Sequence, residues 1–306
     1  MKTVLAALTL ILTFGVTAQA DPVQVDETFT KAQKWLDEKN LTVTGGTNGA
    51  RDDQAAFGQE ALIFYGEAAG NPAHSYPGQR EQMAKRAAVV MAQRSLIEYL
   101  EGFALVGDTL VKECMTQYDV VRSAVTGFVK GSQVDFTEYN PEKNTAIAIV
   151  KLGLHGPQGF ASKMYENMLS DPKIKESLKT DKPAFKGEPT KLDEAYDGLI
   201  IDATEQTFRP ALINRIFAAK GDVLYDPAKI SQKVLVEQGC GEYTNSVDKA
   251  KAALATRGVK NPLVIKASGA PTVADLQVTD NDAVTIYSAN QKGNFMATAR
   301  VAFVLK

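Results

Sequence analysis

The chain has 306 residues, with 34 Lys and Arg against 36 Asp and Glu, so its formal net charge at pH 7 is −2. This balance leaves no basic excess to neutralise phosphates, which argues against nucleic-acid binding. The hydrophobic content of 44% is enough to build cores, and the length suits two domains of ordinary size. No long apolar run follows the first 20 residues, so we expect no membrane-spanning segment.

Residues 1–20 have the pattern of a cleavable signal peptide. Lys2 provides the positive start, an apolar run follows over 4–16, and Ala18-Gln19-Ala20 forms a small-x-small cleavage site. An uncleaved anchor is the alternative, although the run is shorter than the roughly 20 residues of a membrane span. No Cys lies near the cleavage site, so we expect no lipid anchor. The sequence predicts a periplasmic or secreted protein that is at most peripheral to the outer membrane.

A weakly patterned lead-in is expected over 21–78. It contains a candidate helix at 27–38, loop composition at 44–49 and a short apolar strand candidate at 61–65. Several turn signals with Asn, Pro and Gly precede residue 79. We therefore expect this segment to be a lead-in to the first domain.

Residues 79–155 are expected to form the first domain. A helix is predicted over 79–103, with apolar residues at helical spacing and enough alanine for a neighbour to pack closely. Its predicted apolar face comprises Met83, Ala87, Val90, Met91 and Ile97. A second helix is predicted over 119–128, and strand candidates at 133–139 and 145–154 form a hairpin. This order predicts an α+β domain.

Residues 156–194 contain four prolines and a balanced mixture of charges, which favours a solvated linker. The second domain is expected over 195–306. Its candidate elements alternate along the chain, with strands at 198–203, 211–217, 223–225, 233–237, 263–267 and 297–305 and helices at 246–257 and 279–290. The whole chain is therefore expected to be α+β, with mixed or antiparallel strands packed against helices in two small domains.

The two cysteines, Cys114 and Cys240, lie 126 positions apart. In an oxidising compartment they are candidates for a disulfide between the domains, which would stabilise the fold by roughly 4–5 kcal/mol through loop closure. Two buried free thiols are the alternative. A zinc site at Cys240 is disfavoured because no second Cys or His lies close by.

Arg209 and Arg215 are candidate contacts to an anionic ligand or to the acidic surface of a partner. The alternative is that they form ion pairs within a hairpin, as most surface charges do. The two histidines, His74 and His155, fall in loop or strand-end positions, and no hydrolase, zinc-protease or phosphate-loop motif occurs. We therefore expect no catalytic residue, no cofactor and no metal.

Two stretches carry a resemblance to known proteins. The first comprises the helix from Ala87-Ala88 to Gly102, then Val106-Gly107-Asp108-Thr109, and then the segment Val125 to Gly131 before the hairpin. Over roughly 79–155 it is similar to the bacterial outer-membrane lipoproteins of about twenty kilodaltons. The domain of that family also occurs in flagellar H-ring and basal-disc assembly proteins. The chain departs from the lipoproteins in lacking their lipid-bearing Cys.

The second stretch contains Tyr196 to Ala203, Arg209 to Leu212, Asp282-Ala283 and Ala289 to Phe295. It resembles the segment that follows such domains in uncharacterised exported proteins. The resemblance implies a non-enzymatic structural or assembly component of the cell envelope, associated with the flagellar basal body or forming homo-oligomers. The alternatives are a periplasmic module that binds a small anion or a peptide, and an enzyme whose site is assembled from scattered residues.

Overall fold

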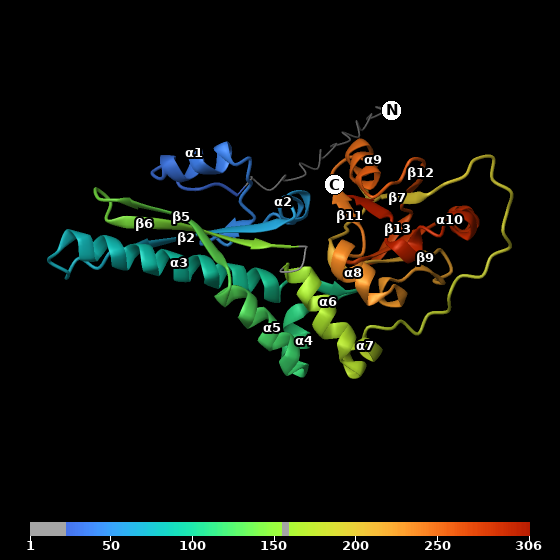
Figure 1. Cartoon of the computed structure of the whole chain (residues 1–306), viewed down its shortest axis with the longest axis horizontal. Helices are drawn as coiled ribbons and strands as arrows, with labels where there is room; N and C mark the ends of the chain where they lie inside the picture. Colours follow the sequence, from blue (N-terminus) through green and yellow to red (C-terminus); the bar gives the residue numbers. More distant parts are fainter. Residues whose placement is uncertain (1–22, 155–158) are drawn as a thin grey trace, which may run out of the picture.

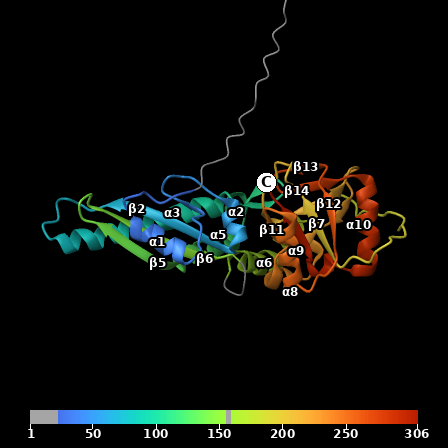
Figure 2. The ribbon, with the colours of Figure 1, turned by 90° about the horizontal axis from the view of Figure 1, so that it is seen from above.

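The computed structural model describes residues 23–154 and 159–306 (Figure 1). The predicted signal peptide and His155 lie outside these residues. Helices and several sheets occur along the whole described chain, which confirms the α+β class and the two-domain layout. The domains lie end to end in an elongated molecule, as the two perpendicular views show (Figures 1 and 2).

The first domain is built on a four-stranded sheet with the strand order β1-β2-β6-β5. The strands are β1 (Gly45–Gly46), β2 (Ala61–Ala69), β5 (Gln133–Asn140) and β6 (Thr145–Gly153). Strand β2 pairs with β6 along its whole length. The segment 21–78 is therefore no separate lead-in, because its strand β2 forms a central part of the sheet.

Two helices cover opposite faces of this sheet: α1 (Thr30–Glu38) and α3 (Pro77–Glu101). Successive side chains of a strand point to opposite faces. Accordingly, Ile63 and Tyr65 of β2 are buried in the cluster with α1, whereas Leu62 and Phe64 are buried in the cluster with α3. The short helix α2 (Asp53–Gly58) precedes β2 and lies toward the second domain (Figure 1).

Helix α3 approaches the sheet unusually closely because its buried face is made of alanines. Ala84, Ala88 and Ala92 are fully buried, and the first two pack against Ala146 and Ala148 of β6. A Cβ added to Gly66 of β2 would overlap the backbone of α3. The inward face is therefore the alanine stripe, as the close packing expected from the alanines requires, whereas Met83 and Val90 of the predicted apolar face are exposed.

Between α3 and β5 the chain forms β3 (Ala104–Val106), β4 (Thr109–Leu110), α4 (Val111–Gln117) and α5 (Asp119–Lys130). After β6, the chain forms α6 (Phe160–Ser170) and α7 (Pro172–Ser177). Seven of the eleven α6 residues are buried. The predicted solvated linker over 156–194 is thus wrong for α6 and α7, because Met and aromatic side chains there pack between α5 and the second domain.

Residues 179–197 form an extended strap along the second domain. Ala184 forms a bridge with Val223, and the ring of Phe185 lies 5.7 Å from that of Tyr287. The backbone nitrogen of Thr190 donates a hydrogen bond of 2.9 Å to Ser288. This part of the predicted linker contains no helix or named strand, but it is held to the domain surface.

The second domain contains a parallel sheet with the order β11-β15-β7-β12. Its strands are β7 (Gly198–Asp202), β11 (Glu242–Thr244), β12 (Pro262–Lys266) and β15 (Val301–Val304). A second sheet has the order β10-β9-β14-β13. These strands are β9 (Arg215–Ala218), β10 (Val223–Tyr225), β13 (Gly269–Thr272) and β14 (Asp275–Val278).

The helices of the second domain are α8 (Gln232–Gln238), α9 (Val247–Thr256) and α10 (Asp280–Gly293). The strand predicted over 233–237 is wrong, because Ser231 caps a helix there by accepting a hydrogen bond from the Val234 nitrogen. The strand predicted over 211–217 is divided at Asn214, and its first part is β8 (Ala211–Ile213).

The two domains share both a sheet and a core. Strand β3 of the first half pairs in parallel with β8 of the second, which completes the three-stranded sheet β4-β3-β8. One cluster of buried hydrophobic residues runs from Phe57 and Phe103 to Tyr243 and Phe303. Phe57 contacts Tyr243 across the junction with ring centroids 4.6 Å apart. The domains are therefore joined by continuous packing.

None of the helices in the described ranges combines the length and the apolar character needed to cross a membrane.

Candidate functional site

Arg209 lies at the junction between the domains and is engaged by Asp53 of α2. Its Nη2 and Nε atoms donate hydrogen bonds of 2.9 and 3.1 Å to Asp53 Oδ2. The hydroxyl of Tyr99 donates to Asp53 Oδ1 at 2.8 Å, and the Arg51 guanidinium lies 4.5 Å from the Tyr99 ring centroid. Burial raises the pKa of Tyr99 well above its ordinary value, so this hydroxyl stays protonated. The ion-pair alternative therefore describes Arg209 better than a ligand contact.

Arg215 is buried inside the second domain. Its Nη2 donates a hydrogen bond to the Leu178 carbonyl oxygen, and its Nε lies 3.6 Å from Asp226 Oδ1. Only 8% of the residue is exposed. Arg215 thus ties α7 to β9, and a ligand has no access to its guanidinium.

The two cysteines form no disulfide with each other: both are buried free thiols. Cys114 lies in α4, whereas Cys240 lies before β11, where its Sγ is 3.1 Å from the Tyr243 hydroxyl. Burial raises the pKa of both thiols, so they remain protonated and unreactive at neutral pH. The free-thiol alternative is the arrangement that the structure adopts.

Buried tyrosines satisfy the backbone around Cys240. Tyr225 donates to the Cys240 carbonyl oxygen at 2.5 Å, and Tyr165 of α6 donates to the Leu212 carbonyl oxygen. Tyr243 donates to Asn214 Oδ1 at 2.5 Å. Burial raises the pKa of all three phenols well above the ordinary value. This network fixes the domain junction and presents no group poised to react with a substrate.

The remaining candidates for chemistry are scattered. His74 lies in the turn that precedes α3, and His155 is outside the described residues. Among the residues that the structure describes, no group of three or more His, Cys, Asp or Glu side chains is placed to hold a metal ion. Within the described residues, Cys240 and Glu242 have no third metal-binding side chain beside them.

A cavity of about 600 Å³ lies between α2 of the first domain and β11 and α9 of the second. It opens beside the carboxyl end of β11, the edge at which parallel sheets commonly bind ligands. Its polar lining includes Asn40 and Gln54 on one wall and Asn245 and Lys249 on the other. This cavity is the place in the described chain best suited to a small polar ligand.

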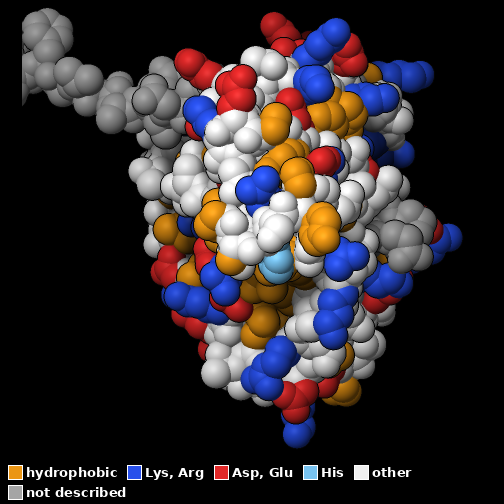
Figure 3. Space-filling model, turned by 90° about the vertical axis from the view of Figure 1, so that its left-hand side faces the viewer, with side chains coloured by type: hydrophobic (Ala, Val, Ile, Leu, Met, Phe, Trp, Pro, Cys, Tyr) orange, Lys and Arg blue, Asp and Glu red, His pale blue; other side chains and the backbone are white. Residues whose placement is uncertain are grey.

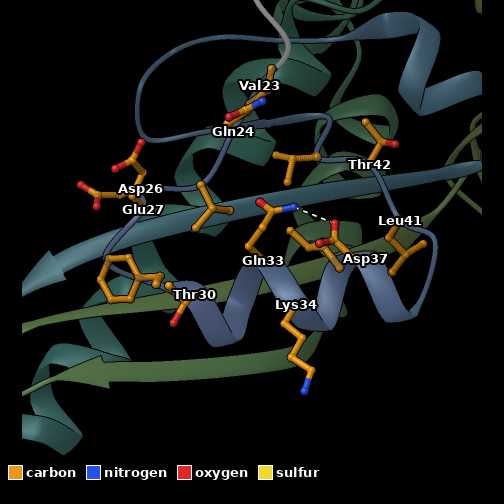
Figure 4. A pocket seen from close by; sticks show the side chains of 14 residues that line it. Val23, Gln24, Asp26, Glu27, Thr30, Gln33, Lys34, Asp37, Leu41 and Thr42 are labelled. Atoms are coloured by element: carbon orange, nitrogen blue, oxygen red, sulfur yellow. Dashed lines mark hydrogen bonds between the residues drawn. The ribbon is translucent and has the colours of Figure 1, made fainter.

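A second hollow, of about 690 Å³, lies between α1 and the segments on either side of it (Figure 4). Its rim carries Asp26, Glu27 and Asp37, and Gln33 donates a hydrogen bond of 2.9 Å to Asp37. The side chains that point toward its floor are apolar. The hollow is wide and open, and the groups on its rim do not converge on one point.

The exposed hydrophobic side chains gather on the first domain. Of the six large hydrophobic residues that the described chain leaves exposed, five belong to this domain: Tyr76, Met83, Val90, Val120 and Val134. The sixth, Val264, lies on β12 at the edge of the parallel sheet. Figure 3 views the free end of the first domain and shows hydrophobic side chains interspersed with both basic and acidic side chains. Among them, Met83 and Val90 lie on one side of a single helix, α3, and neighbouring exposed apolar side chains are typical of interaction surfaces.

Two of these residues, Met83 and Val90, belong to α3. We call Met83, Arg86, Ala87, Val90 and Arg94 the α3 outer face, because they lie on the side of the helix away from the sheet. Val90 is 58% exposed and Met83 is 42% exposed. The sequence indicated Met83, Ala87 and Val90 as one apolar face of the helix, and the structure leaves Met83 and Val90 exposed. The alanines at intervals of four, opposite Gly66 of β2, were the signal that the other face is buried.

The second domain is similar to a known one. Residues 198–306, about a third of the chain, match the family model described as the second domain of Treponema pallidum Tp0624. The match begins at the first residue of β7 and extends through β15. No curated protein matches the chain.

Proposed function

We propose that this chain is a non-enzymatic, exported protein of the cell envelope that acts as a structural or assembly component. The first domain is its docking part, and the second domain is the rigid body joined to it. The observation that carries this proposal is the concentration of exposed hydrophobic side chains on the first domain, above all Val90 and Met83 on α3.

Three further observations support it. Arg209, Arg215 and Cys240, the residues best able to do chemistry, are all taken up by contacts inside the protein. The signal-peptide pattern of residues 1–20 favours export. The resemblance of residues 79–155 to envelope lipoproteins and flagellar assembly proteins favours the periplasmic face of the outer membrane, with attachment to a partner in place of a lipid anchor.

The first test is the absolute mass of purified residues 21–306 by light scattering, with and without reductant, together with a deletion strain. We expect envelope complexes isolated from the deletion strain to lose a component or dissociate. Imaging of basal bodies and a motility assay then test the flagellar association. Unchanged envelope complexes, together with a strictly monomeric protein, would contradict the proposal.

The cavity between α2 and α9 favours a second candidate function, a periplasmic binding module. Asn40, Gln54 and Asn245 offer hydrogen bonds, and Lys249 offers a positive charge for a small anion or a peptide carboxylate. The Asp52 carboxylate also lines the cavity, where it caps α2 by accepting a hydrogen bond from the Ala55 nitrogen. A thermal-shift screen with such ligands tests this function, and substitution of Lys249 by Ala should abolish any stabilisation found. Arg209→Ala is a poor test of this site because it breaks the ion pair with Asp53.

A further inference from the structure

Helix α3 presents a long, regular surface to solvent. It runs for 25 residues, from Pro77 to Glu101, and its buried residues lie on the side that faces the sheet and α5. On the opposite side, Met83, Ala87, Val90 and Arg94 follow one another at intervals of four, three and four. This is the spacing at which a straight second helix makes repeated contact. No described element lies beneath the N-terminal half of α3 (Figure 1).

The apolar stripe extends beyond α3 toward the edge of the sheet. Gln93 donates hydrogen bonds of 3.4 Å to the Val129 carbonyl oxygen and 3.3 Å to the Ser132 hydroxyl. Ser132 stands two residues before Val134, which is 45% exposed. Val134 pairs with Val150, a residue of the core on the α3 side of the sheet. Val134 therefore lies on the α3 side of the sheet, at its edge strand.

Positive charge predominates along α3 as far as Ile97, and the acidic residues Glu98 and Glu101 follow in its last turn. Between Tyr76 and Ile97 the chain has four basic residues and one acidic residue, Glu81. Glu81 is paired with Lys85 at 2.7 Å. Arg86 and Arg94, which flank Val90, form no ion pair with any residue in the described ranges. Two unpaired guanidinium groups, one turn before and one turn after the exposed Val90, are complementary to carboxylates that accompany an apolar side chain.

A second copy of this chain fits the surface poorly. Two α3 outer faces in contact would bring Arg86 and Arg94 of one copy against the same residues of the other, and like charges in an interface disfavour the pairing. Pairing between copies through the edge strand β5 is also disfavoured. This strand carries Asp135 and Glu138 and has a bulge between Val134 and Phe136, and both features protect sheet edges.

We propose that the α3 outer face binds an acidic amphipathic helix of a partner protein. The apolar residues of that helix would pack on Met83, Ala87 and Val90, and its carboxylates would pair with Arg86 and Arg94. This inference rests on the proposed assembly function and specifies the partner's chemistry. The exposed stripe from Met83 to Arg94 accommodates about three turns of helix.

The test uses the full exported chain and two fluorescent peptides of about 20 residues each, long enough to cover the stripe. Both place Leu at coiled-coil spacing; one carries Glu at the flanking positions, and the other carries Lys. Binding is measured by fluorescence anisotropy at low and high salt. We expect the Glu peptide to bind, its affinity to fall with salt, and the Lys peptide not to bind.

Variants test whether the peptide binds on α3. Val90→Glu should weaken binding of the Glu peptide by about tenfold or more, as expected for a central apolar contact. Val264→Glu is the matched control, because Val264 is an exposed valine on the second domain at 40% exposure, and it should bind as the wild type does. The double variant Arg86→Glu with Arg94→Glu should prefer the Lys peptide. Circular dichroism confirms that each variant is folded.

The inference is overturned if neither peptide binds, if both bind equally, or if Val264→Glu weakens binding as much as Val90→Glu. A concentration-dependent dimer that Val90→Glu dissociates would assign the surface to a second copy instead. Binding to phosphatidylglycerol vesicles without binding to the Glu peptide would assign it to lipid. The assembly function is tested separately. Envelope complexes that are unchanged in a deletion strain would contradict that function, whether or not the peptides bind.

Discussion

Replacing Gly66 by Ala tests whether the contact between α3 and the sheet is as tight as the structure indicates. The added Cβ would lie 2.8 Å from the Met91 carbonyl carbon and closer still to the Ala88 carbonyl oxygen and the Ala92 nitrogen. These are backbone atoms, so no side chain can rotate away. Overpacking of this kind costs about 1–3 kcal/mol, and the loss of glycine's freedom in the unfolded chain offsets roughly 0.4–1 kcal/mol of it.

The net loss of unfolding free energy is then about 1–2 kcal/mol. For a chain of this size it corresponds to a fall in Tm of roughly 2–8 °C. Thermal unfolding followed by circular dichroism measures this shift. Gly127→Ala is the matched control, because a Cβ at Gly127 in α5 meets nothing within 4 Å, and alanine in an exposed helix gains about 0.5–1 kcal/mol. If Gly66→Ala raised Tm as Gly127→Ala should, the reasoning would be refuted.

Three further predictions concern the junction and the buried groups. A double-mutant cycle with Asp53→Asn and Arg209→Met should give a coupling free energy of about 1 kcal/mol in urea unfolding, because the pair is only partly exposed. A coupling of zero would show that this ion pair does not stabilise the junction. Burial raises the pKa of the Asp275 carboxyl above its ordinary value of 3.8. The folded protein therefore loses stability as the pH rises above 3.8 and this carboxyl has to ionise in a buried place. Asp275→Asn should therefore raise the free energy of unfolding at neutral pH, and its difference from the wild type should vanish near pH 3. An equal difference at both pH values would contradict the direction of the pKa shift. Cys114 and Cys240 should resist a thiol reagent in the native protein and react after unfolding, whereas fast labelling of the folded chain would show that they are accessible.

The elements with strong local signals could be predicted from the sequence. The helix predicted over 79–103 corresponds to α3, and the hairpin predicted over 133–154 corresponds to β5 and β6. Each of these carries its periodicity and its end signals within its own residues. Helix α9 is a similar case, because Ser246 caps it as the sequence indicated, accepting a hydrogen bond from the Lys249 nitrogen.

Features that depend on distant residues could not be predicted in this way. The charges of residues 156–194 favour a linker, yet the Met and aromatic side chains of α6 find a buried place that only the assembled domains provide. Arg209 looks free in the sequence because its partner, Asp53, lies 156 positions earlier. Both faces of α3 carry apolar residues, and the alanine face is the buried one because it meets Gly66 on a separate strand.

The pairing of β3 with β8 also sets an order of events during folding. The strand at 104–106 is completed by 211–213, so more than one hundred further residues must be synthesised or translocated before it finds its neighbour. At a rate of about 5–20 residues per second, that interval lasts roughly 5–20 s. During it, the first half of the chain presents an open strand edge and an unfinished core. The nascent intermediate, and not the finished protein, is therefore the species most exposed to aggregation and most in need of a chaperone.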